Sequence, residues 1–376
     1  MERLSLRPIA PGWTIGAILL LGAVAGPAMA TGSISGKVTA PASRSADPLD
    51  SSGSEVSGSA ARVNATNDKF QDFRTTVGAD GTYKLDGLDP GTYTVVVVGE
   101  GAQTIIKPGV TVTDGKDTPM DVTLVEAQPF SIVKAAGGTP IPLTDDYNSA
   151  SFADAPEIDL NQAWQLENEL NANIPLTVWG GPQEMSGKFK FKYSTAAIHL
   201  AADINYKTPG VNNWPDNGGQ EIWDGNHIDF FFQNDAYDPK RTDFDSDHDW
   251  QVAVRLTDTP AFKIFQNGAP PSDQDPPSQN ATIQNYVLRK VKADKSGELD
   301  RFDFPWAMFG QHGNKTGAIS VPADNTLSAM DISVGEADPA MAAADAHIKL
   351  RMSWSGFFEG WHHPNLLVPI KFTPQP

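Results

Sequence analysis

Four aspartates alternate with other residues in one short segment of the chain: Asp243, Asp245, Asp247 and Asp249. Calcium takes about six to eight oxygen ligands, and closely spaced carboxylates on a loop can supply them. Without a cation these negative charges would repel one another. The segment lacks the glycine and the distal glutamate of an EF-hand loop, so it is not that motif. It predicts a structural calcium site, and the alternative is a solvated acidic loop.

A second group of residues that could bind a ligand consists of tryptophans in loop-like sequence. They lie near glycine, proline or asparagine, and they are Trp179, Trp214, Trp223 and Trp361. An indole on a loop offers a flat apolar face. Sugar rings have apolar C–H faces and polar edges, so an indole with a few hydrogen-bonding side chains suits them. The pattern indicates carbohydrate binding, and ordinary loop packing is the alternative for Trp223 and Trp361.

Composition and the absence of known motifs exclude several kinds of catalytic and metal site. The absence of cysteine excludes thiolate zinc sites, iron–sulfur clusters and a cysteine nucleophile. The sequence contains no Gly-x-Ser-x-Gly, phosphate loop or His-Glu-x-x-His motif. A glycosidase needs two carboxylates about 5–10 Å apart, but among 46 acidic residues such pairs can always be found. A formal charge of −18 argues against nucleic acid as a partner. Enzymatic activity stays open, and a non-catalytic role is favoured.

The first thirty residues have the features of a secretory signal peptide. Arg3 and Arg7 precede an apolar run over residues 15–25, and the segment ends in Ala28-Met29-Ala30. The apolar run is shorter than the ~20 residues that a transmembrane helix needs. We therefore expect cleavage after Ala30 and a secreted or periplasmic monomer that does not insert into a membrane. An uncleaved membrane anchor is the alternative.

Short strands separated by turns fill residues 31–126. Asp-Gly and Pro-Gly pairs supply the turns, and β-branched and aromatic residues lie between them. This pattern predicts a small β-sandwich. The strings at residues 36–38, 80–83 and 87–95 resemble the carboxypeptidase-regulatory-like (transthyretin-like, Ig-type) domain. The resemblance implies a non-catalytic spacer or display domain. Residues 127–142, which include a run of alanine and glycine, are expected to be a linker.

Alternating strands also predominate in residues 143–376. Residues 188–193, 250–256 and 330–334 alternate in polarity. Residues 348–354 alternate strictly, with Lys349, Arg351 and Ser353 on the face opposite the apolar residues. We expect an antiparallel β-sandwich of about ten strands. The fold class predicted for the whole protein is therefore all-β, a small Ig/transthyretin-like sandwich followed by a larger antiparallel one.

This second segment resembles the family 9 carbohydrate-binding module and its dopamine-monooxygenase-like relatives. The resemblance is carried by residues 156–164, 221–232, 330–338 and 351–354, followed by a further tryptophan at 361. It implies that Trp223 and Trp361 sandwich a sugar and that Asp229 hydrogen-bonds it. It also implies structural calcium near the acidic segment.

The polar positions that the resemblance implies differ here from the family pattern. The binding arginine of the family falls at Ala253, with Arg255 two residues on and on the same face. The binding glutamine falls at Ser333, and the asparagine two residues later falls at Gly335. The predicted sugar-binding set is therefore Trp223, Trp361, Asp229, Arg255 and Ser333.

Three functional hypotheses follow. The first is a secreted, non-catalytic carbohydrate-binding protein associated with carbohydrate catabolism, with calcium bracing the acidic segment. The second is a heme-binding or purely structural module of the same fold, for which the candidate iron ligands are Met308, Met330, Met352 and His199. The third is a glycoside hydrolase acting on O-glycosyl bonds through a pair of carboxylates.

Overall fold

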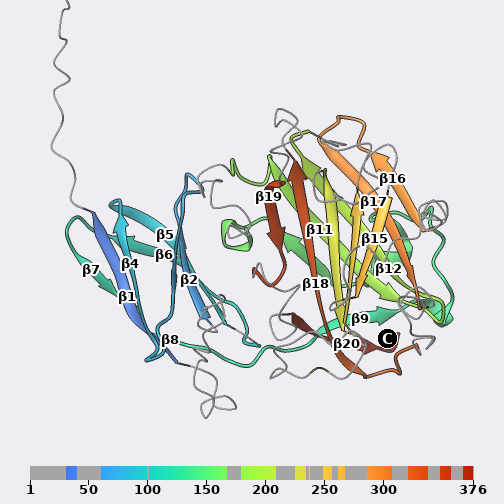
Figure 1. Ribbon diagram of the computed structural model, residues 1–376, viewed down its shortest axis with the longest axis horizontal. Coiled ribbons are helices and arrows are strands. Elements are labelled where there is room, and N and C mark those ends of the chain that lie inside the picture. The colour runs from blue at the N-terminus through green and yellow to red at the C-terminus, as the bar shows by residue number, and fades with distance from the viewer. Residues whose placement is uncertain are drawn as a thin grey trace, which may run out of the picture.

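Alternating polarity along the chain becomes a series of β-strands in the computed structural model (Figure 1). The structure describes residues 31–39, 61–99, 101–166, 179–208, 225–233, 237, 249–255, 261–266, 286–306, 321–337, 348–356 and 367–375. The expected signal peptide lies outside these residues. Within them the helical elements are three-residue 3-10 turns, namely η2 (Ala136–Gly138), η3 (Ala150–Phe152) and η4 (Ala163–Gln165). The predicted all-β class is confirmed. No helix in the described part of the chain is both long and apolar enough to cross a membrane.

The first unit contains two small sheets that share one core. One sheet has the order β4-β1-β7, with β8 also pairing with β1, and the other has the order β3-β2-β5-β6. Apolar residues from both sheets, among them Ile34, Val63, Leu85 and Val97, are buried together between them. The strands are β1 (Gly32–Thr39), β2 (Ala61–Thr66), β3 (Asp72–Thr76), β4 (Thr82–Leu88), β5 (Gly91–Gly99), β6 (Ile105–Val112), β7 (Asp117–Pro119) and β8 (Val122–Thr123).

The second unit is built from one sheet of twelve described strands. Its order is β15-β14-β13-β18-β20-β9-β11-β12-β17-β16, with β10 beside β11 and β19 beside β18. The strands are β9 (Phe130–Lys134), β10 (Glu157–Leu160), β11 (Met185–Tyr193), β12 (Ala197–Tyr206), β13 (His227–Gln233), β14 (Asp249–Arg255), β15 (Ala261–Gln266), β16 (Val287–Val291), β17 (Gly297–Pro305), β18 (Leu327–Ala337), β19 (Ile348–Ser353) and β20 (Val368–Thr373).

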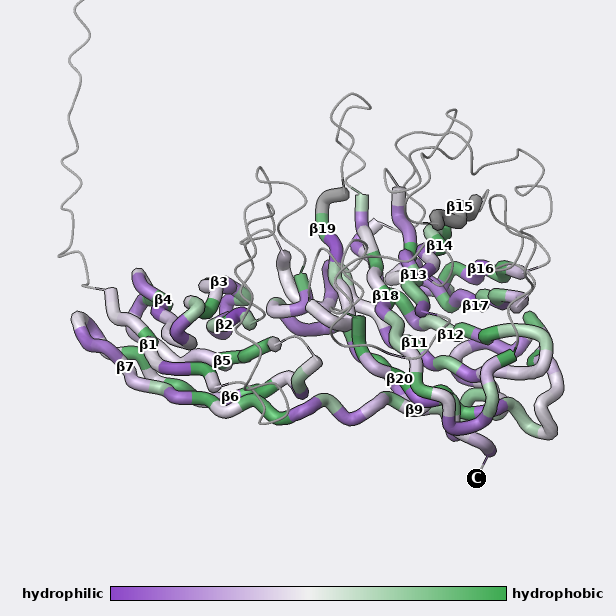
Figure 2. The backbone as a smooth tube through the Cα atoms, turned by 60° about the horizontal axis from the view of Figure 1, so that its bottom comes forward, coloured by the Kyte–Doolittle hydropathy of each residue, from purple (hydrophilic) through white to green (hydrophobic). Residues whose placement is uncertain are grey.

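This sheet folds so that its two halves face each other across the core. The ring of Phe230 on β13 stacks on Phe191 of β11 at 5.6 Å and on Phe304 of β17 at 4.8 Å between ring centroids. Such contacts bury aromatic area and fix how the two halves pack. Figure 2 shows hydrophobic and hydrophilic residues alternating along many of the strands, as expected when one face of each strand is buried.

Two sequence-based expectations are corrected here. Residues 130–134, expected to be part of the linker, form β9, which pairs in parallel with both β20 and β11. This strand joins the two halves of the sheet. Trp179, expected on an exposed loop, is buried, and its indole N–H donates to the Met185 carbonyl oxygen at 3.1 Å.

The two units lie side by side and are joined by hydrogen bonds as well as by the chain (Figure 1). Arg62 of β2 is buried, and its Nη2 donates to the carbonyl oxygens of Trp164 (3.0 Å) and Gly356 (2.5 Å). Arg74 of β3 donates to the carbonyl oxygen of Ala163 at 3.0 Å. The junction therefore uses charged donors on the first unit to satisfy backbone acceptors within η4 and in the segment that follows β19.

Candidate functional site

Polar side chains gather on one face of the β14-β13-β18-β19 part of the sheet. Along β13, Ile228, Phe230 and Phe232 belong to the core, so His227 and Asp229 lie on the opposite face. We call the following residues on this face the outer-face cluster: His227, Asp229, Gln251, Ser333 and Arg351. The strand register explains why they meet, because Asp229 pairs with Ser333, and Gly335, two residues further along β18, pairs with both His227 and Arg351.

A buried ion pair holds the cluster together. Arg351 Nη2 lies 2.8 Å from Asp229 Oδ2, and Arg351 Nε donates to Ser333 Oγ at 3.0 Å. The side chains of Arg351 and Asp229 are only 7% and 4% exposed. Ion pairs this deeply buried are strongly coupled, since little water remains to screen either charge. Arg351 therefore orients two of the three polar residues that the sequence predicts to contact a sugar, Asp229 and Ser333.

His227 occupies the space that a side chain at position 335 would need. A Cβ atom built on Gly335 would lie 2.1 Å from His227 Cε1, far closer than van der Waals contact. The imidazole Nδ1 lies 2.7 Å from the Gly225 carbonyl oxygen, which assigns the proton to Nδ1. Burial lowers the pKa of His227, with Asp229 opposing this and Arg351 adding to it. The ring is therefore neutral near pH 7, with the lone pair on Nε2, 3.6 Å from Asp229 Oδ2.

Hydrogen-bonding capacity remains at three atoms of the cluster. Asp229 Oδ1 accepts a 3.4 Å contact from Gln251 Nε2, and within the described residues this is its one hydrogen bond. The Ser333 hydroxyl accepts from Arg351, while no described acceptor takes its proton. His227 Nε2 is buried without a hydrogen-bond partner in the described part of the chain. Two acceptors and one donor thus lie close together on one face.

A second buried carboxylate lies on the same face of β18. Asp331 accepts hydrogen bonds from the Ser355 hydroxyl (2.5 Å), the Ser355 amide (3.1 Å) and the Ile332 amide (2.8 Å). Burial raises its pKa to about 6, although these donors favour the carboxylate. Asp331 anchors the turn after β19 and is fully engaged within the protein.

The structure brings together some of the predicted site residues. Asp229 and Ser333 are neighbours, and Arg255 pairs with His227 through the backbone on β14. Asp249 begins β14, where it is fully buried. The other predicted residues lie outside the described part of the chain, and these are Trp223, Trp361, Asp243, Asp245 and Asp247.

Three cluster residues were not predicted. The alternation of residues 348–354 places Arg351 opposite the apolar face, but no local pattern shows that it pairs with Asp229. His227 and Gln251 were missed for the same reason, because strands that are distant in sequence bring them next to Asp229.

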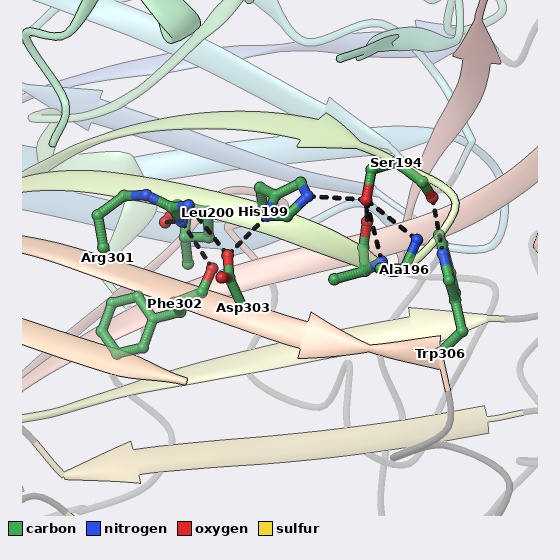
Figure 3. A network of polar contacts seen from close by, with 9 residues as sticks. Ser194, Ala196, His199, Leu200, Arg301, Phe302, Asp303 and Trp306 are labelled. Carbon is green, nitrogen blue, oxygen red and sulfur yellow. Dashed lines mark hydrogen bonds and ion pairs between the residues drawn. The ribbon is translucent and has the colours of Figure 1, made fainter. Parts of the chain in front are cut away.

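A different set of residues has the geometry of a serine hydrolase triad (Figure 3). Ser194 Oγ lies 2.9 Å from His199 Nε2, and His199 Nδ1 lies 2.6 Å from Asp303 Oδ1. Arg301 also donates to Asp303, at 3.0 Å. However, Ser194 is fully buried, and its Oγ accepts the amides of Ala196 (3.1 Å) and Ala197 (3.2 Å).

These contacts show that Ser194 stabilises the turn between β11 and β12, and they argue against a role as a nucleophile. The Ser194 oxygen already accepts two backbone amides, so its lone pairs are engaged within the protein and are not available to attack a substrate. The same contacts bear on heme ligation, because both ring nitrogens of His199 are already bonded. Met330 and Met352 are buried in the hydrophobic core, and Met308 lies outside the described residues.

Comparison with known proteins supports the resemblance of the first unit. Residues 33–125 match the family model of the carboxypeptidase regulatory-like domain, which confirms the resemblance predicted from the sequence. No curated protein matches the chain significantly.

Solved structures similar to the chain include a family 9 carbohydrate-binding module from Caldicellulosiruptor kristjanssonii in complex with cellotriose. The two share 12% identity over 66% of this chain and 95% of that one, with a TM-score of 0.40. The same module in complex with glucose gives 12% identity, coverage of 65% and 97%, and a TM-score of 0.37. A candidate carbohydrate-binding protein from Bacteroides uniformis gives 13% identity, coverage of 66% and 100%, and a TM-score of 0.38. Likenesses this distant assign no function to this chain.

Proposed function

We propose that this chain is an exported, non-catalytic carbohydrate-binding protein that binds sugar hydroxyl groups at its outer-face cluster. One observation carries the proposal. Asp229 and Ser333, which the sequence predicts as sugar contacts, are paired on neighbouring strands, and both have unused hydrogen-bonding capacity. A carboxylate acceptor beside a hydroxyl donor matches the alternating donors and acceptors along the edge of a sugar ring. Arg351 orients both groups and so prepares the site before a ligand arrives.

In this proposal Trp223 and Trp361 supply the apolar faces. Chain connectivity is compatible with this role. Trp223 precedes the start of β13 by four residues, and Trp361 follows the end of β19 by eight. At about 3.5 Å per residue, their Cα atoms lie within about 14 Å of His227 and about 28 Å of Ser353, respectively. Arg255, which pairs with His227 on β14, is proposed to border the same site.

The calcium site and the cellular context complete the proposal. Asp249 begins β14, so calcium bound by the segment from Asp243 to Asp249 would brace the strand that carries Gln251. The proposed setting is outside the cytoplasm, either secreted or periplasmic, where a monomer takes part in carbohydrate catabolism.

Affinity electrophoresis in gels containing soluble xylan or a soluble cellulose derivative tests the proposal. We expect at least one polysaccharide to retard the wild-type protein. Asp229→Asn should weaken retardation about tenfold or more, because hydrogen bonds to a charged group contribute about 1.5–3 kcal/mol. Trp223→Ala should weaken it similarly if the indole stacks on the sugar.

The matched control is Asp86→Asn. Asp86 lies on the first unit with a side chain 64% exposed, so its change removes the same charge far from the cluster. The control should migrate like the wild type. An absence of retardation on every polysaccharide would refute the proposal, as would equal retardation of Asp229→Asn and the control.

A further inference from the structure

A cleft of about 360 Å³ opens at the junction of the two units, and no residue of the outer-face cluster lines it. This volume is within the range of about 300–1,000 Å³ that is typical of small-ligand pockets. Its walls come from the loop between β5 and β6, from η4, and from the chain on either side of the β19–β20 connection. Both units therefore contribute to one concave surface.

Specific contacts hold the cleft walls in place. Arg62 donates to the carbonyl oxygens of Trp164 and Gly356, and Trp164 packs against Val96 and Val98 of β5. Gly356 has φ +73°, and a Cβ atom there would lie 2.9 Å from Trp164 Cζ3, so the backbone approaches the indole closely. The cleft is thus a built feature of the docked units rather than a loose gap.

The lining combines flat apolar surfaces with uncharged polar groups. Trp164, which is 8% exposed, and the half-buried Trp354 are both lining residues. Gln103 and Gln128 line the cleft as well, and neither side chain forms a hydrogen bond with another described residue. Among the described lining residues Asp159 is the one that carries a charge, and its carboxylate accepts a single described hydrogen bond, from Asn161 at 2.7 Å.

This chemistry favours a neutral, polyhydroxylated ligand. An anion would find no cationic partner among the described lining residues and would meet the Asp159 carboxylate. The side chains of Gln103, Gln128 and Asp159 are exposed, and a purely apolar ligand seated on them would displace water without replacing its hydrogen bonds. A sugar ring satisfies both requirements, because its C–H face covers an indole and its hydroxyl groups donate and accept hydrogen bonds.

We propose that this junction cleft is a second carbohydrate-binding site, in which a neutral sugar unit packs against Trp164 and Trp354 and hydrogen-bonds Gln103, Gln128 and Asp159. The ligand class rests on the function proposed above, whereas the site is separate. Because both units form the site, a bound sugar stabilises their docked arrangement by RT ln(1 + L/Kd), where L is the concentration of free sugar and Kd its dissociation constant. Arg62 is a positioning residue, since it holds the wall without lining the cleft.

Isothermal titration calorimetry of the full chain with glucose, cellobiose and xylobiose tests this. We expect two sugars per chain. Gln103→Ala/Gln128→Ala should weaken only one of the two sites, by at least about fivefold, as the loss of two hydrogen bonds requires. Arg62→Met should weaken the same site. Lys107→Ala is the matched control, because Lys107 is exposed on β6 and does not line the cleft. It should leave both sites unchanged.

The outcomes separate this proposal from the previous one. One sugar per chain, lost in Asp229→Asn but kept in Gln103→Ala/Gln128→Ala, overturns the cleft site and leaves the outer-face site standing. One sugar lost only in the double glutamine variant supports the cleft and overturns the outer-face site. No binding of any probe overturns both. Saturable binding of tetramethylammonium without sugar binding would mean that the indoles and Asp159 form a cation cage, and this overturns the cleft proposal.

Discussion

Removing Arg351 should destabilise the second unit far more than removing an exposed arginine or lysine. In Arg351→Met the aliphatic stem is largely kept, but Asp229 loses the guanidinium 2.8 Å from its Oδ2 while remaining only 4% exposed. Breaking one partner of a buried ion pair costs about 3–5 kcal/mol, because the remaining charge is neither solvated nor paired. For a unit whose free energy of unfolding is about 5–15 kcal/mol, this is a large fraction.

The size of the effect can be compared within the same protein. Lys188 Nζ and Glu157 Oε1 are also 2.8 Å apart, but these side chains are 47% and 35% exposed. Lys188→Met should therefore cost less than about 1 kcal/mol, since water screens the pair. The two variants differ mainly in burial, so the contrast isolates the contribution of desolvation.

A double-mutant cycle measures the coupling directly. Asp229→Asn leaves Arg351 bonded to Ser333, so we expect it to cost about 1–3 kcal/mol. The double variant Asp229→Asn/Arg351→Met removes both charges, and its loss should be about 2 kcal/mol smaller than the sum of the single losses.

Tryptophan fluorescence during urea unfolding is a suitable assay. All nine tryptophans lie outside residues 31–126, and all except Trp13 lie at residue 164 or later, so the fluorescence follows the second unit. A loss of less than about 1 kcal/mol in Arg351→Met would contradict this prediction, and so would two single losses that add without coupling. Either result would mean that the Asp229 carboxylate is solvated or neutral, and the outer-face cluster would lose its proposed preorganisation.

Three further predictions concern neighbouring features. Because the folded-state pKa of Asp331 is about 6 rather than 3.8, folding favours its protonated form, so this group should reduce stability as pH rises from about 4 to 6. This pKa difference corresponds to about 3 kcal/mol of stability. The urea midpoint of Asp331→Asn should therefore fall less between about pH 4 and pH 6 than that of the wild type. Parallel pH curves for the two proteins would contradict the raised pKa of Asp331. Gly335→Ala should lower the free energy of unfolding by about 1–3 kcal/mol through its clash with His227, and an unchanged urea midpoint would show that the imidazole lies elsewhere. Ser194→Ala should cost about 1–2 kcal/mol by removing an acceptor from two backbone amides, with no change in p-nitrophenyl acetate hydrolysis; esterase activity abolished by this change would identify a working triad instead.

Much of the fold could be predicted because its signals are local. Polarity alternates along residues 188–193, 250–256, 330–334 and 348–354, and each stretch contributes to a strand with its apolar side toward the core. Turn residues at 80–81 precede β4, and residues 89–90 separate β4 from β5, as expected. These patterns depend on neighbours within a few positions, which a single sequence contains in full.

The features that were missed depend on contacts between distant parts of the chain. The segment at 130–134 has too few residues to show a clear pattern, and it becomes β9 because β20 and β11 offer it two parallel edges. Trp179 has loop-like neighbours, yet it is buried with its N–H bonded to Met185. Local sequence describes a residue's neighbours along the chain, whereas burial is decided by the whole fold.

The outer-face cluster also combines features that the local sequence predicts with features that depend on distant strands. The family resemblance implies a sugar-binding asparagine at position 335, so the glycine found there suggests, from the sequence alone, that a binding group has been lost. In the structure the glycine is required, because the imidazole of His227 lies directly across it on the neighbouring strand. A small residue on one strand and a large one on its partner form a single unit, so neither can be judged from its own position in the sequence.

The two proposed sites place different demands on the fold, and this difference makes them separable. The outer-face cluster is held by an ion pair within one sheet, so it should persist when the units are pulled apart. The junction cleft depends on Arg62, which reaches acceptors 102 and 294 residues away in the chain. Loosening that junction should therefore abolish one site and leave the other intact. Loss of both sites in Arg62→Met would instead mean that the outer-face cluster is stable only when the first unit is docked.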